Sequence, residues 1–324
     1  MVEIKSIGLL TSGGDAPGMN AAIRAVTRIA LQRGIRVVGV NHGYSGLVSG
    51  DFIELRAFSV SNIIQRGGTI LKTARSAEFM TPEGRKKAAE QMQRIGLDAL
   101  VLIGGDGTFQ GGTVFHEEHG FPCVGIPSTI DNDLVGIDWT VGYDTAVNTA
   151  IYNIDKIRDT ADALERTFYI EVMGRSSGFI ALDVGLSCGA EYIAIPEIET
   201  KVEHLLELFK RQRATKRSNI IVVAENDETG GAMGLAKRVQ EKNGQDYRVT
   251  ILGHIQRGGS PTARDRILAS RLGAFAVESL LSGHTNVMAG ELGGKLCLTP
   301  MRDTWTFNKP IDASLVELAA LLAM

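Results

Sequence analysis

The sequence predicts an α/β protein with two doubly wound lobes, in which helices cover both faces of mainly parallel sheets. Short apolar runs typical of buried strands alternate along the chain with longer segments whose apolar residues recur at helical spacing. This alternation is typical of parallel sheets, and 324 residues are enough for about two domains. We therefore expect the functional loops at the carboxyl ends of the strands.

The amino-terminal half contains a series of strand–loop–helix units. The helix predicted for residues 20–33 has apolar residues on one face and Gly34 as its terminator. Pro82 suits the first turn of a helix over residues 83–95, which Gly96 closes. Strands are expected at residues 7–10, 37–40, 99–103 and 123–126, and a further helix after residue 108 runs to residue 118.

The second half begins with a long helix predicted for residues 144–164, where seven apolar residues recur at helical spacing. We expect this helix to bridge the two lobes. Strand and helix pairs then follow at 167–172 and 178–187, 192–195 and 202–213, 220–224 and 231–242, and 248–252 and 262–281.

Composition and charge exclude several classes of function. The 34 Lys and Arg residues against 37 Asp and Glu residues give a net charge of −3, so no global basic field attracts nucleic acid or anionic lipid. Three distant cysteines without C-x-x-C spacing argue against a disulfide framework or a zinc site. No stretch approaches a membrane span and the amino terminus lacks a signal-peptide pattern. We expect a cytoplasmic protein that is neither secreted nor inserted.

The segment from Pro127 to Asp133 follows a predicted buried strand. Pro127 lacks an N–H group and is expected to end the ladder. An extended backbone would then place Asp131 and Asp133 on the same side, where two carboxylates suit a general base beside a magnesium site. Asp-Asn-Asp is also common in turns, so the segment alone leaves both interpretations open.

Two glycine-rich loops, at residues 12–15 and 104–108, each lie between a predicted strand and helix. Their backbone N–H groups can receive phosphate oxygens, although neither loop matches the P-loop or the dinucleotide fingerprint, and both remain compatible with simple tight turns. Asp106 favours the phosphate interpretation, because a magnesium ion that bridges phosphate groups needs an oxygen ligand.

Four arginines flank strands in a chain without excess positive charge: Arg166, Arg175, Arg248 and Arg257. Any one of them can be an ordinary solvated arginine, but together they suggest clamps for a phosphorylated substrate. Glu225, at the end of a strand, can accept hydrogen bonds from sugar hydroxyls. The run of residues 116–119 is interpreted as a solvated helix end and receives no metal.

Five motifs together resemble the bacterial ATP-dependent 6-phosphofructokinase family, and their order and spacing cover nearly the whole chain: residues 10–20, 104–108, 129–133, 173–175 and 252–261. The resemblance implies a homotetramer that transfers a phosphoryl group from ATP to fructose 6-phosphate in glycolysis, giving fructose 1,6-bisphosphate and ADP. It also implies two discontinuous lobes. Residues 1–142 plus 256–305 would bind the nucleotide, and residues 143–255 plus 306–324 would bind the sugar phosphate.

The resemblance further implies roles for individual residues. Asp131 would act as the base on the 1-hydroxyl group, and Arg175 would stabilise the transferring phosphoryl group. Thr129 and Asp133 would lie beside Asp131, and Asp106 would bind Mg²⁺. The remaining nucleotide positions are Gly14, Arg75, Ser76, Gly105, Gly107 and Thr108. The remaining sugar-phosphate positions are Arg166, Met173, Gly174, Glu225, Arg248, His254 and Arg257, of which Arg166 and Arg248 would reach in from a neighbouring subunit.

An effector site that binds ADP or phosphoenolpyruvate between subunits is implied as well. Its residues in this chain would be Arg24, Arg28, Arg158, Glu191 and Lys216. Four cations suit an anionic effector, and Glu191 suits the magnesium that accompanies a nucleotide diphosphate. Asn62 replaces a family aspartate, and Ala214 aligns with a family arginine. We therefore expect effectors to bind but to have only a weak effect on activity with fructose 6-phosphate.

Other departures bear on the phosphoryl donor and on rival families. Ser128 stands where ATP users have glycine and pyrophosphate users have lysine, and Asn226 stands where glycine is usual. Gly107 stands where pyrophosphate users place an aspartate, which favours ATP, while pyrophosphate remains the alternative.

NAD kinases and diacylglycerol-type lipid kinases share the loop at 104–108 but lack the motifs at 129–133 and 253–259. A catalytically silent sugar-phosphate sensor would have little reason to retain Asp106, Asp131 and Arg175.

Overall fold

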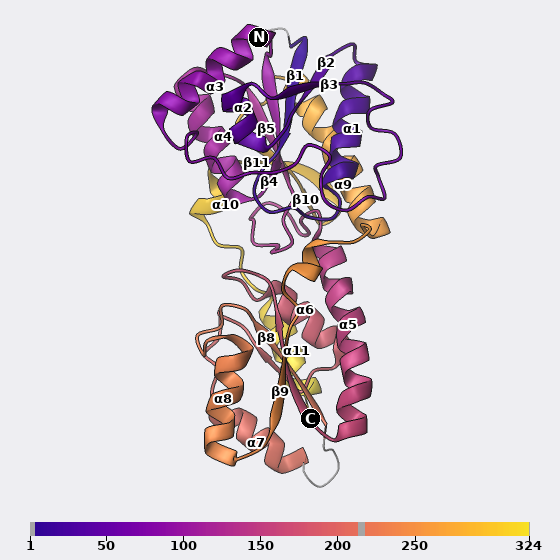
Figure 1. Cartoon of the computed structure of the whole chain (residues 1–324), viewed down its shortest axis with the longest axis vertical. Helices are drawn as coiled ribbons and strands as arrows, with labels where there is room; N and C mark the ends of the chain where they lie inside the picture. Colours follow the sequence, from indigo (N-terminus) through magenta and orange to yellow (C-terminus); the bar gives the residue numbers. More distant parts are fainter. Residues whose placement is uncertain (1–3, 213–217, 324) are drawn as a thin grey trace. The chain divides into compact units, whose positions relative to one another are not determined.

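A seven-stranded sheet with the strand order β11-β10-β5-β4-β1-β2-β3 organises the first part of the computed structural model, which describes residues 4–212 and 218–323 (Figure 1). Its pairings are parallel except at the two edges, where β3 and β11 are antiparallel to their neighbours. The strands are β1 (Ser6–Thr11), β2 (Arg36–Val40), β3 (Phe52–Leu55), β4 (Ala99–Gly104), β5 (Cys123–Pro127), β10 (Val287–Leu292) and β11 (Lys295–Pro300).

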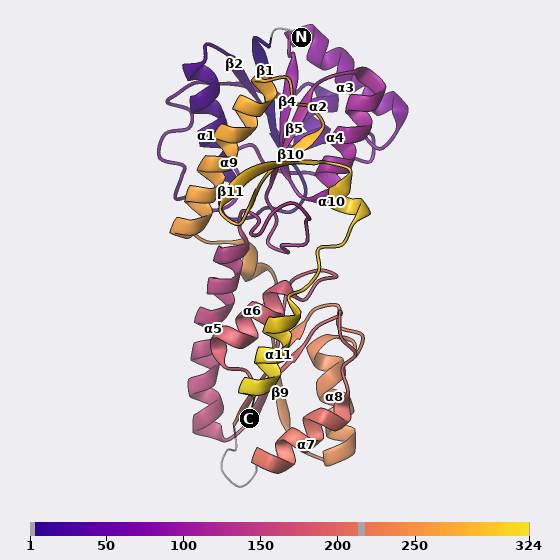
Figure 2. The ribbon, with the colours of Figure 1, turned by 180° about the vertical axis from the view of Figure 1, so that it is seen from behind.

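Helices cover both faces of this sheet, and the strands between them are almost fully buried. Helices α1 and α9 pack side by side on one face, with α2, α3 and α4 on the other (Figures 1 and 2). The predicted end signals of α3 are confirmed, because Pro82 begins the helix and Gly96 ends it with a φ of 66°; Thr81, which was not singled out, caps its first turn. The helices are α1 (Met19–Gln32), α2 (Gly43–Ser49), α3 (Pro82–Ile95), α4 (Asp106–His119), α9 (Ala263–Leu281) and α10 (Asp303–Thr306).

A second sheet has the order β7-β8-β6-β9, and all of its pairings are parallel. Helices α7 and α8 lie on one face, with α6 and α11 on the other (Figures 1 and 2). The strands are β6 (Thr167–Val172), β7 (Tyr192–Ala194), β8 (Asn219–Ala224) and β9 (Tyr247–Ile251). The helices are α5 (Tyr143–Leu164), α6 (Phe179–Cys188), α7 (Val202–Gln212), α8 (Gly231–Asn243), the 3₁₀ helix η1 (Gly253–Arg257) and α11 (Ala313–Leu322).

The chain divides into two units that are both discontinuous in sequence. The first consists of residues 1–129, 134–145 and 257–309, and the second of residues 130–133, 146–256 and 310–324. The chain therefore leaves the first unit within the first turn of α5 and returns at the end of η1. Among the residues that the structure describes, none of the helices is long and apolar enough to cross a membrane.

The α/β prediction with mainly parallel sheets is confirmed, and the structure differs from the local expectations at three points. β5 ends at Pro127, one residue later than the predicted strand: Pro127 pairs with Gly104 of β4, and its carbonyl oxygen accepts a hydrogen bond from the Val141 N–H group. A proline lacks only the donor, so its acceptor still serves the sheet. Asn132 has a φ of 55°, so the segment between Asp131 and Asp133 is not extended and the alternation argument does not apply to it.

The third difference is the omission of several elements. The strands β3, β10 and β11 and the helices α2, α10 and α11 were not predicted. β3 and β11 are largely exposed edge strands, and α2 and α10 span seven and four residues. Such short or exposed segments carry too little apolar periodicity to separate them from loops.

Candidate active site

Three candidate loops meet at the carboxyl ends of the adjacent parallel strands β1, β4 and β5. The Ser12 N–H group donates to the Ile103 carbonyl oxygen over 3.0 Å, and the Ser128 N–H group donates to the Gly104 carbonyl oxygen over 2.9 Å. A Cβ atom on Gly104 would lie 2.5 Å from the Ser12 carbonyl oxygen, so only glycine allows this approach. The sheet thus brings together the loops that the sequence singles out, at the edge where open α/β sheets bind ligands.

The loop at residues 104–108 is shorter than expected, because α4 begins at Asp106. Asp106, Gly107 and Thr108 therefore form the first turn of this helix, and the capping position, Gly105, has no side chain that can cap it. Backbone N–H groups at a helix amino terminus attract anions, and the helix dipole adds to this attraction. The half-buried Asp106 and exposed Gly107 lie where phosphate groups would meet this terminus.

The segment after β5 is anchored on both sides. The Thr140 hydroxyl group donates to the Thr129 carbonyl oxygen over 2.6 Å, and Ser128 forms a bridge with Val141. Asp131 is only 7% exposed, and its carbonyl oxygen accepts from the Ser177 hydroxyl group within the second unit. Asp131 is therefore held in a largely desolvated position, which suits a general base.

Arg257 belongs to the first unit and lies against the loop that follows β1. Its Nη1 atom donates to the Asp15 carbonyl oxygen over 3.4 Å, and a Cβ atom on Gly14 would lie 2.2 Å from the same nitrogen. Arg75 is exposed and Ser76 caps a turn by accepting from the Phe79 N–H group. Arg257 thus joins a predicted nucleotide position, Gly14, within the first unit.

At the carboxyl end of the second sheet, the loops after β6 and β8 are joined. The Arg175 N–H group donates to Glu225 Oε1 over 2.8 Å, and Asn226 Nδ2 donates to the Arg175 carbonyl oxygen over 2.9 Å. Arg175 has a φ of 58° and follows Gly174 with a φ of 143°, so these hydrogen bonds hold a strained turn. Asn226 thus contributes a side-chain hydrogen bond that a glycine at this position could not make.

Two supporting residues were not singled out from the sequence. Gln256 is fully buried, and its Oε1 atom accepts from the Met173 N–H group over 2.9 Å. The Ser177 hydroxyl group contacts the carbonyl oxygens of Gly174 and Asp131. Gln256 lies close to His254 in η1, within the motif at residues 252–261, and this position could have indicated a role at the site. Nothing in the sequence around Ser177 indicates that it contacts residue 131.

Arg166 and Arg248 lie at the other end of this sheet. Arg166 precedes β6, and Arg248 is the second residue of the parallel strand β9, so both lie at the amino end of the sheet. Arg248 Nη1 pairs with the Asp246 carboxylate and with the Tyr247 carbonyl oxygen. Within one chain these two arginines and Arg175 belong to opposite ends of the same sheet.

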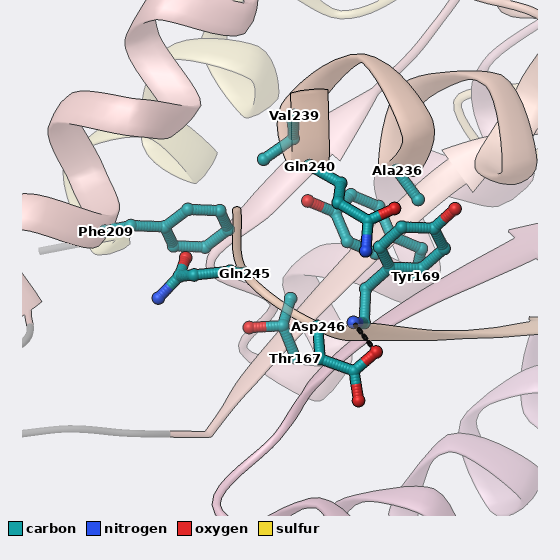
Figure 3. Close-up of a pocket in the computed structure, with 9 residues that line it drawn as sticks. Thr167, Tyr169, Phe209, Ala236, Val239, Gln240, Gln245 and Asp246 are labelled. Carbon is teal, nitrogen blue, oxygen red and sulfur yellow. Dashed lines mark hydrogen bonds between the residues drawn. The ribbon is translucent and has the colours of Figure 1, made fainter. Parts of the chain in front are cut away.

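Two pockets in the described part of the chain contain none of the predicted site residues. One lies at the amino end of β6 and β9 and is shown in Figure 3, where Phe209 and Tyr169 line it; a cavity of about 10 Å³ leaves room for one water molecule at most. The hydrogen bond drawn there joins the Tyr247 N–H group to Asp246. The other, of about 310 Å³, lies in the first unit beside Trp139, whose ring is covered by the Arg264 guanidinium at 3.6 Å.

The expected effector residues are partly occupied by structural contacts. Arg158 donates to the carbonyl oxygens of Cys188 and Gly189, and Glu191 is 4% exposed and accepts from the Ile220 N–H group. Arg24 and Arg28 lie on α1. Lys216 and the aligned Ala214 lie outside the described residues. The Glu191 carboxylate is thus occupied by the backbone of β8. This contact does not favour a role as an exposed ligand of a nucleotide-bound metal.

A magnesium ion fits the first unit only as a partner of phosphate. No group of three or more His, Cys, Asp or Glu side chains suitable for a metal occurs in the described part of the chain. Magnesium is commonly held by one or two carboxylates with substrate phosphates and water, and the single half-buried carboxylate of Asp106 at the phosphate-binding terminus suits that arrangement. The run 116–119 is the carboxyl end of α4, and Glu117 and Glu118 are exposed, as expected of a solvated helix end. Glu118 also pairs with the buried Arg85, and that hydrogen bond lowers the pKa of Glu118.

Comparisons with known proteins agree with this geometry. A family model described as phosphofructokinase matches residues 6–280. The chain is 56% identical to ATP-dependent 6-phosphofructokinase 1 of Thermus thermophilus over 99% of this chain and 100% of that protein. It is 54% identical to ATP-dependent 6-phosphofructokinase 2 of Bacteroides thetaiotaomicron over the full length of both.

Solved structures extend the likeness. Phosphofructokinase from Saccharomyces cerevisiae matches with a TM-score of 0.86 and 36% identity, over 93% of this chain and 45% of that longer one. A pyrophosphate-dependent phosphofructokinase from Marinobacter aquaeolei matches with a TM-score of 0.85 over 96% of this chain and 86% of that one, and its 22% identity shows a shared fold alone.

Proposed function

Because this chain belongs to the phosphofructokinase family, its reaction is phosphoryl transfer from ATP to fructose 6-phosphate in glycolysis, and we propose which residues carry it out. The observation that supports these roles best is the position of Asp131. Its carboxylate belongs to a largely buried segment that Ser177 ties to the turn carrying Arg175.

Asp131 accepts the proton of the 1-hydroxyl group of fructose 6-phosphate as that oxygen attacks the γ-phosphorus of ATP. Burial favours this role, because a carboxylate with little water around it is a stronger base. Arg175 stabilises the negative charge on the transferring group, and its turn is fixed by Glu225 and Asn226. Thr129 and Asp133 lie next to the base in sequence and shape the same segment.

ATP is held by the edge of the first unit. The amino terminus of α4, with Gly105, Gly107 and Thr108, receives phosphate oxygens, and Gly14, Arg75 and Ser76 complete the nucleotide contacts. Asp106 would hold Mg²⁺, which supplies neutralising charge to the phosphates when bound. Gly107 supports ATP over pyrophosphate, because its exposed position carries no carboxylate that would repel the nucleotide phosphates.

Fructose 6-phosphate is bound by the edge of the second unit, with Met173, Gly174, Glu225 and His254. The distant position of Arg166 and Arg248 supports a homotetramer in which a neighbouring subunit supplies these two arginines. We infer accordingly that the first unit is the nucleotide-binding lobe and the second the sugar-phosphate-binding lobe of a cytoplasmic enzyme. ADP or phosphoenolpyruvate would act as effectors through Arg24, Arg28, Arg158 and Lys216.

A coupled assay for ADP release with fructose 6-phosphate, ATP and magnesium tests the activity directly. We expect saturable turnover that requires all three components. ADP release without fructose 6-phosphate, or none with it, would contradict the proposal.

A further inference from the structure

Helix α5 begins without a capping side chain of its own. The residue before its first turn is Gly142, with a φ of 104°, and a Cβ atom there would lie 2.7 Å from the Cβ atom of Ala16. Glycine is therefore required at a position where Ser, Thr, Asp or Asn would otherwise bind the free N–H groups of the helix.

Asp265, in the first turn of α9, supplies the missing cap. Its Oδ1 atom accepts from the Gly142 N–H group over 2.8 Å, and its Oδ2 atom accepts from the N–H and hydroxyl groups of Thr145 over 2.9 and 2.5 Å. Asp265 is 1% exposed. One buried carboxylate thus binds both N–H groups that a capping residue and its third neighbour normally satisfy within a single helix.

Helix α5 in turn contributes a carboxylate to the amino terminus of α9. Thr262 caps α9 by accepting from the Asp265 N–H group, while its hydroxyl group donates to Asp144 over 2.6 Å. The Thr262 N–H group donates to the Thr145 hydroxyl oxygen over 3.0 Å. Each helix therefore has a first-turn carboxylate that serves the other, and these two negative charges offset the positive ends of both helix dipoles.

This reciprocal cap, formed by Asp144, Thr145, Thr262 and Asp265, lies between two segments of the proposed site. On the α5 side, Val141 and Thr140 bind Pro127 and Thr129, just before the proposed base. On the α9 side, the helix follows directly from the segment that carries His254 and Arg257.

We propose that the reciprocal cap positions these two segments for phosphoryl transfer, so that Asp265 is a positioning residue that touches no substrate. The inference rests on the proposed function. Loss of the cap would displace the base loop and the sugar-phosphate loop, whereas the phosphate-binding terminus of α4 would stay in place. The kinetic effect should accordingly fall on fructose 6-phosphate and on turnover, while the KM for ATP stays constant.

Asp265→Asn tests this directly. Asparagine keeps the shape but has a single acceptor oxygen, so either the Gly142 or the Thr145 N–H group faces an amide NH₂ group. We expect kcat/KM for fructose 6-phosphate to fall by roughly 5- to 150-fold, the range for leaving one buried donor unsatisfied. The KM for ATP should stay within about twofold. Asp312→Asn, the same change at the cap of α11, is the control and should keep parental kinetics.

A second pair covers the case in which Asp265→Asn fails to fold. Thr145→Val removes the hydroxyl group between Asp265 and Thr262, whereas Thr145→Ser retains it. We expect Val to reproduce the selective loss and Ser to restore most of it. Parental values of both fructose 6-phosphate parameters in Asp265→Asn or Thr145→Val would overturn the proposal, as would equal losses toward both substrates. The unmodified enzyme in the same assay tests the proposed function separately, since only ratios to it report on the cap.

Discussion

Arg166, just before β6, and Arg248, the second residue of β9, lie at the amino end of the same sheet, and the opposite ends of these adjacent parallel strands lead to Arg175 and His254. A strand of five or six residues spans about 17–20 Å, so one chain cannot easily use both ends of the sheet for one small sugar phosphate. This relationship is the physical reason to expect a site completed by a second subunit.

Hybrid tetramers give the first prediction. Subunits carrying Asp131→Ser and subunits carrying Arg248→Ala, each poorly active alone, should regain activity when co-expressed with different tags and purified as mixed oligomers. Such a hybrid contains sites in which an intact Asp131 meets an intact Arg248. The matched control combines Asp131→Ser with Arg175→Ala, which we place in one subunit and which should not complement. Failure of the Arg248 hybrid would argue that this arginine serves its own chain.

The second prediction concerns the base. Asp131→Ser should lower kcat by roughly 10²- to 10⁴-fold, because general-base catalysis contributes about that much. Fructose 6-phosphate binding, measured by calorimetry, should persist. The control is Asp138→Ser, which makes the same substitution at an exposed aspartate of the segment between β5 and α5. Near-parental turnover in Asp131→Ser would show that another group takes the proton.

The third prediction concerns the donor. The enzyme should turn over faster with ATP than with pyrophosphate at saturating magnesium, and the reverse order would contradict the ATP assignment. A Cβ atom on Gly107 meets no other atom within 4 Å, so Gly107→Asp can be accommodated sterically. Its carboxylate should raise the KM for ATP by about tenfold or more, equivalent to about 1.4 kcal/mol. Gly107→Ala separates added volume from added charge and should have a much smaller effect.

The fourth prediction concerns regulation. Phosphoenolpyruvate should shift the fructose 6-phosphate saturation curve only slightly, because Asn62 lacks the family's charge and Glu191 is buried against β8. Losing one charged contact typically costs 1–3 kcal/mol as an order of magnitude. A strongly sigmoidal, right-shifted curve with phosphoenolpyruvate would show that these features do not weaken the switch.

The fifth prediction concerns stability and pH. Burial, as the largest cause, and the nearby charge of Asp144 raise the pKa of Asp265 to about 6 from an ordinary 3.8, although hydrogen bonds from Thr145 and Gly142 oppose the rise. The folded state then binds this proton more tightly than the unfolded state, so stability falls as the pH rises from about 4 to 6. The free energy of unfolding of the parent should lose about 3 kcal/mol relative to Asp265→Asn across this window.

Urea unfolding of both proteins at several pH values between 4 and 7.5 measures this difference. A gap between them that is constant, or that changes in the opposite sense, would show that Asp265 titrates near its ordinary pKa in the folded protein.

The fold class, the order of the central strands and helices, and the loops that carry chemistry follow from the sequence. Helix ends such as Pro82 and Gly96 are local requirements that the sequence shows directly. The family motifs added residue roles that composition and periodicity do not supply.

Only the tertiary structure decided which distant residues serve each other. Arg166 and Arg248 look equivalent to Arg175 in the sequence, and their separation follows from the direction of parallel strands, which becomes visible once the pairing of β6 and β9 is known. In the sequence, Asp265 is an ordinary acidic residue in the first turn of α9. In the structure it caps α5, whose first residues lie more than a hundred positions earlier in the chain. Such contacts depend on how elements pack in three dimensions, and no local pattern encodes them.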